Sequence, residues 1–257
     1  MTLKRPVRSK SPLRYPGGKS HAVEQILMKM PDVKSIVSPF FGGGSVEIAC
    51  ADRMNIPVYG YDLFLPLVKF WQCEKEDPSR LADVIESFHP LMDEQFKIFK
   101  KDILNLELDD YEVAAKFFIL NRSSFSGLTL SGGKSPGFQR FTKNSISKVR
   151  RFECDNLMWV KEMDFEESIS SHPDSFIFAD PPYMIEGKLY GRYGDLHFGM
   201  EDHERLRSIL SSRDRWMLCY NDCEKIRDLY EGFEISCPEW SYGISKRRSS
   251  EILILSV

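Results

Sequence analysis

The chain has 257 residues, of which 42% are hydrophobic and 28% charged, and its formal net charge is −3 at pH 7. This composition is typical of a soluble globular protein, and the length allows one domain or one domain with an insertion. No apolar run approaches the roughly 18 residues of a membrane span, so we expect no membrane contact. The basic N-terminus, residues 1–19, lacks the apolar core of a secretory signal.

Six cysteines are scattered along the chain without a Cys-x-x-Cys pair. In a chain of this size the pattern favours reduced, mostly buried thiols and a cytoplasmic protein, with disulfides as the alternative. We expect no metal site, and a monomer or weak dimer. The cysteines are Cys50, Cys73, Cys154, Cys219, Cys223 and Cys237.

The first 62 residues alternate between helix and strand signals. Apolar residues recur at helical spacing after residue 21, and a short apolar run then leads into three glycines. Together they predict a β-turn-α-β unit, the first half of a nucleotide-binding sheet. The predicted elements are a helix at 21–30, a strand at 35–40, a tight turn at 42–44, a helix at 45–51 and a strand at 58–61 that ends at Asp62.

The next 84 residues, 63–146, change to a different pattern. Few strand signals occur, and residues 122–146 are rich in Ser, Gly, Lys and Phe, which predicts a hairpin or an ordered loop. We interpret 63–146 as a mainly helical insertion into a sheet domain built from 1–62 and 147–257. Its predicted helices lie at 66–77, 79–88, 91–104 and 111–121.

The α/β pattern resumes after the insertion and completes an α/β, Rossmann-like sheet. A Gly- and Tyr-rich loop at 184–199 interrupts it. The predicted elements are helices at 146–155, 201–212 and 222–231, and strands at 157–163, 176–179, 215–220, near 233–237 and at 251–257.

Positive charge is segregated along the chain. Residues 1–23 hold six Lys or Arg and no acid, residues 246–248 form another cluster, and residues 113–152 hold eight basic residues and no acid. This distribution suggests a polyanion partner bound on one face, unless the segments scatter over the fold. The eight are Lys116, Arg122, Lys134, Arg140, Lys143, Lys148, Arg150 and Arg151.

The motif Asp180-Pro181-Pro182-Tyr183 follows the apolar strand 176–179, at the end of a strand where open α/β sheets bind ligands. A carboxylate and a proline-fixed carbonyl can accept two hydrogen bonds from an exocyclic amine, and the tyrosine ring can stack on a flat heterocycle. A simple Pro-rich turn is the alternative.

A second motif runs from Pro39 to Ser45 and joins a strand to a helix through three glycines. Glycines allow a close backbone approach, and a helix N-terminus supplies free N–H groups, although a structural turn is about as consistent. Asp62 ends the next strand, where a carboxylate can bond ribose hydroxyls or cap a helix. Together the two features indicate an adenosine-type cofactor.

These motifs in order, with Tyr15-Pro16-Gly17-Gly18-Lys19 before them, resemble the Dam-type family of DNA adenine-N6 methyltransferases. The resemblance extends from Leu13 to Leu255. It implies a Rossmann-like methyltransferase sheet with an inserted, mainly helical target-recognition domain that carries a β-hairpin. It also implies site-specific methyl transfer from S-adenosylmethionine to an adenine flipped out of double-stranded DNA, with no metal.

The resemblance implies a role for each matching residue. Asp164 and Phe165 match the segment that contacts the cofactor's adenine, and residues 120–128 match the hairpin that enters DNA. The implied catalytic residues are Asp180, Pro181, Pro182 and Tyr183. The implied cofactor-binding residues are Tyr15, Lys19, Phe40, Phe41, Gly42, Gly43, Gly44, Ser45, Asp62, Asp164, Phe165 and Asp180. The expected DNA-binding residues are Asn121, Arg122, Phe125, Ser126, Leu130, Lys134, Arg140 and Lys143.

Two positions depart from the family pattern. Ser126 stands where the family often has Asn, and Leu130 falls where GATC-reading members place an arginine. A bidentate arginine–guanine contact is a strong specificity determinant, so its absence argues against GATC as the target. Two other functions stay open at this point, a non-catalytic DNA-binding module and methyl transfer to another exocyclic amine such as cytosine N4.

Overall fold

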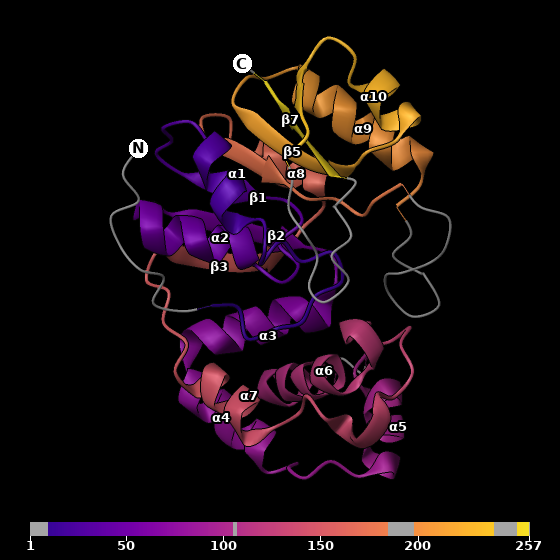
Figure 1. Cartoon of the computed structure of the whole chain (residues 1–257). Coiled ribbons are helices and arrows are strands. Elements are labelled where there is room, and N and C mark those ends of the chain that lie inside the picture. Colours follow the sequence, from indigo (N-terminus) through magenta and orange to yellow (C-terminus); the bar gives the residue numbers. More distant parts are fainter. Residues whose placement is uncertain (1–9, 105–106, 185–197, 239–250, 257) are drawn as a thin grey trace.

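The computed structural model describes residues 10–104, 107–184, 198–238 and 251–256. Within these residues, seven strands form one mixed sheet in the order β3-β2-β1-β4-β5-β7-β6 (Figure 1). The first five of that order are parallel, whereas β7 runs antiparallel to β5 and β6. The strands are β1 (Ile36–Ser38), β2 (Val58–Asp62), β3 (Leu157–Glu162), β4 (Phe176–Ala179), β5 (Trp216–Asn221), β6 (Glu234–Ser236) and β7 (Glu251–Leu255).

Each of these strands confirms a strand predicted from the sequence, with ends that shift by a few residues. β4 spans the predicted residues, because it is an apolar run buried on both faces. β1 is shorter than predicted and stops at Ser38. The next residue, Pro39, has no N–H group with which to extend the ladder.

The order of the strands reverses between β1 and β4. From β1 the chain proceeds outward through β2 to β3, and from β4 it proceeds through β5 in the opposite direction. Parallel sheets bind ligands beyond the carboxyl ends of their strands at such a switch point. Here the glycine turn follows β1 and the motif Asp180–Tyr183 follows β4, so the topology brings the two motifs together.

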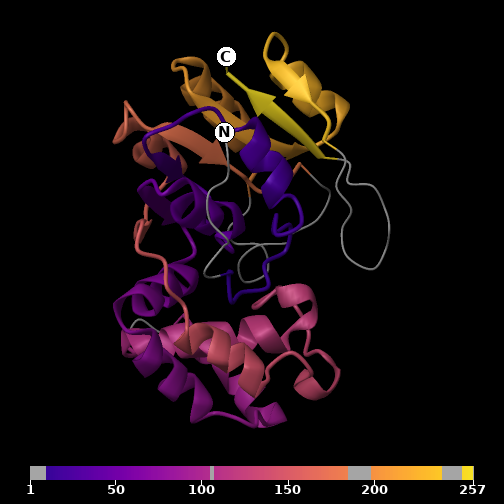
Figure 2. The same ribbon diagram turned by 60° about the vertical axis from the view of Figure 1, so that its left-hand side comes forward.

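Helices cover both faces of the sheet, and a further helical layer lies away from it. Figures 1 and 2 both show α4, α5, α6 and α7 in that layer, with α3 between it and the strands. The helices are α1 (Val23–Lys29), α2 (Ser45–Ala49), α3 (Leu65–Glu76), α4 (Pro78–Glu86), α5 (Asp93–Asp102), α6 (Asp110–Ser123), α7 (Lys143–Arg150), α8 (Phe165–Ser170), α9 (Met200–Ser211) and α10 (Glu224–Leu229). No helix in the described part of the chain is long and apolar enough to cross a membrane.

The helices confirm a mainly helical segment after residue 62, but three local predictions differ from the structure. The helix predicted at 146–155 begins at Lys143, because Thr142 and Ser145 cap its N-terminus reciprocally. Helix α8 was not predicted from the sequence, and Asp164 caps it by accepting a hydrogen bond from Glu166 N at 2.9 Å. The domain boundaries at 62 and 146 stay a prediction.

The third difference is the β-hairpin predicted within 122–146. The structure has one antiparallel bridge there, between Ser124 and Lys134, and short 3₁₀ turns at Phe125–Gly127 and Pro136–Phe138. Positive φ angles of 54° at Ser126 and 46° at Thr129 interrupt any regular strand. Of the two predicted alternatives the segment is therefore an ordered loop, and the described residues do not form the regular β-hairpin that the resemblance implied.

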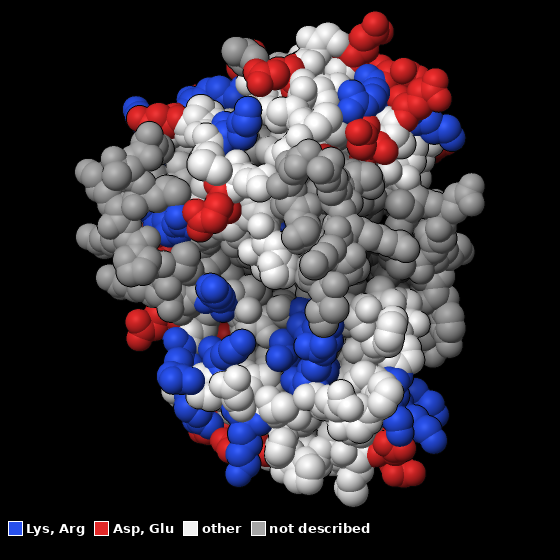
Figure 3. All heavy atoms as spheres, viewed as in Figure 1, with Lys and Arg blue, Asp and Glu red and all other residues white. Residues whose placement is uncertain are grey.

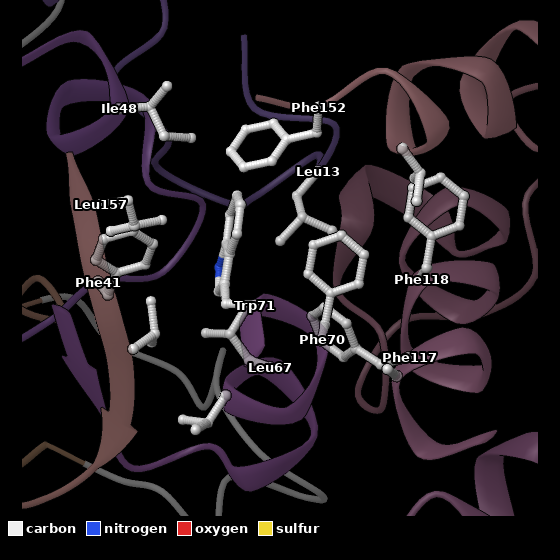
Figure 4. Close-up of a cluster of buried hydrophobic side chains, with 14 of the residues drawn as sticks. Leu13, Phe41, Ile48, Leu67, Phe70, Trp71, Phe117, Phe118, Phe152 and Leu157 are labelled. Carbon is white, nitrogen blue, oxygen red and sulfur yellow. The ribbon is translucent and has the colours of Figure 1, made fainter. Parts of the chain in front are cut away.

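The core is divided between the two faces of the sheet. Along β4, Phe176 and Phe178 pack into one cluster, whereas Ile177 and Ala179 pack into the other with α8, α9 and α10. The first cluster continues through α3 into the helical layer. Figure 4 shows Trp71 and Phe70 of α3 between Phe41 on the sheet side and Phe117 of α6.

A buried glutamate on α3 gives a stability prediction. The carboxylate oxygens of Glu74 have no hydrogen-bond partner among the described residues, and burial raises the pKa of this group well above its ordinary value. Because the folded pKa exceeds the unfolded one, stability falls as pH rises from the unfolded pKa towards the folded pKa. We expect Glu74→Gln to lose less unfolding free energy than the wild type between pH 5 and pH 8 in urea titrations, by about 1–3 kcal/mol.

The exposed Glu76 on the same helix supplies the control. Glu76→Gln should leave the pH dependence of the wild type in place. If the stability of Glu74→Gln and of the wild type changed equally with pH, the folded pKa of Glu74 would not be raised, and its carboxyl would be hydrated or paired in the folded protein.

Candidate active site

The carboxyl ends of β1, β2 and β4 surround a cavity of about 410 Å³. Its size is in the range of small-molecule and cofactor sites. All of the residues predicted to bind the cofactor or to be catalytic line this one cavity. Their individual roles stay predictions. The lining consists of these residues together with Pro16, Gly17, Gly18, Pro39, Val46, Glu47, Leu63, Phe64, Phe178, Phe198 and Asp202.

The glycine turn is packed against Tyr15. A Cβ atom on Gly43 would lie 2.7 Å from the Cβ of Tyr15, and one on Gly42 would lie 2.9 Å from its Cε1. The glycines are thus required for the tyrosine ring to cover the turn, in addition to any approach of a ligand. The ring also joins the N-terminal segment to the wall of the cavity.

Asp62 holds two parts of the cavity wall together. Its Oδ2 accepts a hydrogen bond from Gly42 N at 2.9 Å, and its Oδ1 accepts one from Phe64 N at 3.0 Å. Burial raises the pKa of Asp62, and the bonds from Phe64 and Gly42 oppose that shift. Asp62 therefore orders the glycine turn as well as lining the cavity where a ribose was expected.

Lys19 lies beside Asp180 inside the site. The Nζ atom is 2.8 Å from Asp180 Oδ2 and 2.7 Å from Gly17 O, and its side chain is 3% exposed. The family resemblance implied that Lys19 binds the cofactor, and in the structure Lys19 lines the cavity with its ammonium paired to Asp180 of the motif. Burial raises the pKa of Asp180, and Lys19 opposes this shift.

The other carboxylate oxygen of Asp180, Oδ1, is, within the described part of the chain, an unpaired hydrogen-bond acceptor in the wall of the cavity. Oδ1 is buried and has no hydrogen-bond partner among the described residues. An unpaired acceptor of this kind costs free energy in a folded protein, and such groups gather where a ligand completes them. Since Asp180 lines the cavity, a bound N–H donor would satisfy Oδ1.

Tyr183 forms the adjacent wall. Its hydroxyl donates a short hydrogen bond to Glu251 Oε1, and Lys19 Nζ lies 4.9 Å from the centroid of its ring. Burial raises the pKa of this phenol, and the nearby carboxylates act in the same direction. The next residue, Met184, is held through both backbone groups by the Asn221 side chain.

Aromatic rings form another wall of the cavity. Phe40 stacks on Phe165 with ring centroids 5.5 Å apart, and Phe198 contacts both rings. Asp164 caps α8 and pairs with Arg205 at 3.2 Å. Flat apolar rings with an acidic group beside them suit a purine.

Sequence reasoning missed two acidic residues of the site. Glu47 is buried, accepts a hydrogen bond from Ser38 Oγ at 2.8 Å, and has a pKa that burial raises to about 7. Glu251 is buried at the start of β7. A lone acid in the apolar run Glu251–Leu255 is a signal that could have identified Glu251, whereas Glu47 resembles an ordinary acid in the first turn of a helix.

The predicted DNA-binding residues do not share one environment. Asn121 and Leu130 are buried, so direct contact of these side chains with DNA is not supported. The Asn121 amide instead holds the N-terminal segment, accepting from Arg14 N at 2.9 Å and donating to Arg14 O at 2.6 Å. Phe125 is 64% exposed, and Ser126 beside it is exposed.

Charge pairing divides the basic residues of 113–152 into two groups. Three form ion pairs: Lys116 with Asp102 of α5 and with Glu112 on its own helix, Lys134 with Asp93, and Arg150 with Asp83 and Glu86.

Arg122 and Arg140 belong to the other group and lie near Arg14. Burial, and the positive charges of Arg14 and Arg140, lower the pKa of Arg122 to about 10. The Arg122 guanidinium donates to the carbonyls of Arg140 and Pro12, and no acid pairs with it among the described residues. Figure 3 shows Lys and Arg gathered over the part of the molecule where α3, α6 and α7 lie. Converging cations without acidic partners suit a polyanion.

Comparison with known proteins agrees with this geometry. A model of the D12 class of N6 adenine-specific DNA methyltransferases matches residues 15–244. The Type II methyltransferase M.CviBI of Paramecium bursaria Chlorella virus NC1A is 23% identical over 232 residues, 86% of this chain and 86% of that protein. The DNA N-6-adenine-methyltransferase of Escherichia phage P1 is 25% identical over 251 residues, 88% of this chain but 32% of the phage protein.

Among solved structures, a precorrin-6y C5,15-methyltransferase from Geobacter metallireducens superposes with a TM-score of 0.38 and 10% identity, over 98% of this chain and 97% of that one. That superposition is too loose to carry a structural argument. The family match, in contrast, covers residues 15–244 and therefore every motif from Tyr15 to Tyr183. The chain belongs to the D12 class of N6 adenine-specific DNA methyltransferases.

Proposed function

We propose that this DNA adenine-N6 methyltransferase uses S-adenosylmethionine and acts on an adenine flipped out of double-stranded DNA at a specific sequence. The observation that carries the proposal is the buried, unpartnered Oδ1 of Asp180 at the switch point of the sheet. Adenine N6 is the kind of donor that this acceptor lacks. Inside a duplex N6 is out of reach of a buried carboxylate, so the base must leave the stack.

The residues of the cavity fit S-adenosylmethionine. The rings of Phe40, Phe165 and Phe198 suit its adenine, and Asp62 lies where a ribose can be bound. Among the described lining residues the acids Glu47, Asp62, Asp164, Asp180 and Asp202 outnumber the one basic residue, Lys19, so the cavity favours a cationic ligand. When bound, S-adenosylmethionine supplies a methyl group on a sulfonium, which is an excellent leaving group.

The residues at the end of β4 would prepare the nucleophile. The lone pair of adenine N6 is delocalised into the ring, which makes it a poor nucleophile. Asp180 Oδ1 accepts one N6–H bond and the Pro181 carbonyl accepts the other, which favours a pyramidal and more nucleophilic nitrogen. The bond from Lys19 to Oδ2 favours the ionised form of Asp180, and the Tyr183 ring supports the base. Positioning of the reacting atoms supplies much of the acceleration.

We also propose that residues 63–146 form the target-recognition part. Phe125 is exposed beside Ser126 and can act as an apolar wedge at the duplex, while Arg14, Arg122 and Arg140 lie ready for phosphates. Asn121 links this surface to the cofactor side through Arg14, which immediately precedes Tyr15. DNA contact and cofactor contact thus share one short segment.

Asp62 supplies a test of the cofactor assignment. We expect Asp62→Ala to weaken S-adenosylmethionine binding by about 1.5–3 kcal/mol, because a charged acceptor for the ribose is lost and the glycine turn loses its anchor. DNA binding should change far less. Isothermal titration of wild type and variant with S-adenosylmethionine measures the first quantity, and fluorescence anisotropy with duplex DNA measures the second. Unchanged cofactor affinity would reduce Asp62 to a structural anchor.

A further inference from the structure

The Tyr183 hydroxyl is tied to an acidic side chain on another strand. Glu251 is the first residue of β7 and is 5% exposed, and its Oε1 accepts the hydrogen bond of the tyrosine. A buried carboxylate costs desolvation free energy unless it is paired. Glu251 is therefore held at this position by contacts specific to the site, rather than by packing among its apolar neighbours.

The same oxygen faces the lysine that pairs with Asp180. Lys19 Nζ lies 3.7 Å from Glu251 Oε1 and 2.8 Å from Asp180 Oδ2. One carboxylate oxygen thus contacts the proposed base-stacking residue and lies near the cation that serves the proposed base-binding acid. These contacts join β7, the end of β4 and the N-terminal segment.

The partner of Glu251 across the sheet acts on the next residue of the motif. The register of β5 and β7 pairs Asn221 with Glu251. The Asn221 side chain accepts from Met184 N at 3.1 Å and donates to Met184 O at 3.2 Å. The cross-strand pair therefore holds the backbone of Met184 and the side chain of Tyr183 at the same time.

We propose that Glu251 is a positioning residue for methyl transfer, which acts by fixing the Tyr183 ring against which the target adenine stacks. This proposal rests on the proposed function, since it takes the ring to be the support of the base. Without the anchor the ring can rotate. A base stacked on it then spends less time in the one orientation that presents N6 to Asp180. Misplacement of a reacting atom by about 1 Å can cost on the order of 10²-fold in rate.

A double-mutant cycle tests the proposal. Single-turnover methylation of duplex DNA from labelled S-adenosylmethionine is measured for Glu251→Leu, Tyr183→Phe and the double variant. We expect each single change to slow the rate about tenfold to a hundredfold, and the double variant to be no slower than the poorer single variant. Glu251→Gln should recover most of the rate, because an amide oxygen still accepts the phenol hydrogen. The dissociation constant of S-adenosylmethionine should stay within about twofold.

The control is Glu74→Leu, the same substitution at a buried glutamate outside the cavity, which should leave the transfer rate unchanged. Multiplicative losses in the double variant would overturn the coupling, and so would a Glu251→Gln variant as slow as Glu251→Leu. In both of these outcomes the wild type still transfers methyl groups, so they would overturn the role of Glu251 and not the proposed function. A wild type that transfers no methyl group from S-adenosylmethionine would overturn the proposed function and this inference together.

Discussion

Replacing Asp180 with alanine is expected to abolish methylation while S-adenosylmethionine binding weakens but stays measurable. The change removes Oδ1, the acceptor for adenine N6, and also the partner of Lys19 at 2.8 Å. Removal of a single group that stabilises a transition state typically costs on the order of 10²–10³ in rate, and this group also orients the nucleophile. Transfer of labelled methyl groups to DNA measures the loss, and calorimetry measures cofactor affinity.

The lysine left behind makes a second variant necessary. Asp180→Ala leaves the buried Lys19 ammonium without its main partner, which destabilises the fold. Asp180→Asn keeps the shape and an acceptor oxygen but removes the charge, and it should fold normally while methylating far more slowly than wild type. Near-normal turnover by a well-folded Asp180→Asn variant would contradict the role assigned to the carboxylate.

Neutralising Arg14, Arg140 and Lys143 together should weaken binding to every DNA sequence and flatten its salt dependence. These side chains form no ion pair with an acid among the described residues, so phosphates are their natural partners. Each lost phosphate contact lowers the slope of log K against log salt by about 0.9, and the triple glutamine variant should lose about three times that amount. Anisotropy titrations at several salt concentrations measure the slope.

Basic residues that already have acidic partners are the matched control. Lys134 pairs with Asp93 and Arg150 pairs with Asp83 and Glu86, so changing these two to glutamine should leave the salt slope nearly unaltered. An unaltered slope in the triple variant, or an equal fall in the control, would move the DNA-facing surface elsewhere on the protein.

The sequence alone predicted the sheet and the cavity well, because their signals are local. The apolar run of β4 followed by Asp180 predicts a buried strand with an acidic group at its end. The apolar run of β1 followed by three glycines likewise predicts a strand that ends in a tight turn. A parallel sheet then brings these ends together without further information. The family resemblance drew on these same segments, and the match over residues 15–244 confirms it.

What the sequence did not predict depends on contacts between distant residues. The acid-free stretch 113–152 suggests one basic surface, yet Lys116 pairs with Asp102 of α5 and Arg150 pairs with Asp83 of α4. The pairing of Lys19 with Asp180 joins residues 161 positions apart, so no local sequence signal predicts it. Asn121 was assigned to DNA, and only the fold shows that Arg14 occupies its amide.

The sequence does not decide between the hairpin and the ordered loop within 122–146, for a different reason. Ser-, Gly- and Phe-rich segments suit turns and edge strands about equally, and backbone conformation decides between them. Here Ser126, Thr129 and Phe138 adopt positive φ angles, which no propensity for these residue types predicts.

Mass analysis of nucleosides is the most direct test of the central claim, that Asp180 presents adenine N6 to a methyl group from S-adenosylmethionine. Purified protein is incubated with unmethylated genomic DNA and S-adenosylmethionine that carries a deuterated methyl group, and the DNA is then digested to nucleosides. We predict deuterated N6-methyladenine with wild-type protein and none with Asp180→Ala. Deuterated N4-methylcytosine, or N6-methyladenine at an undiminished level with Asp180→Ala, would contradict the account.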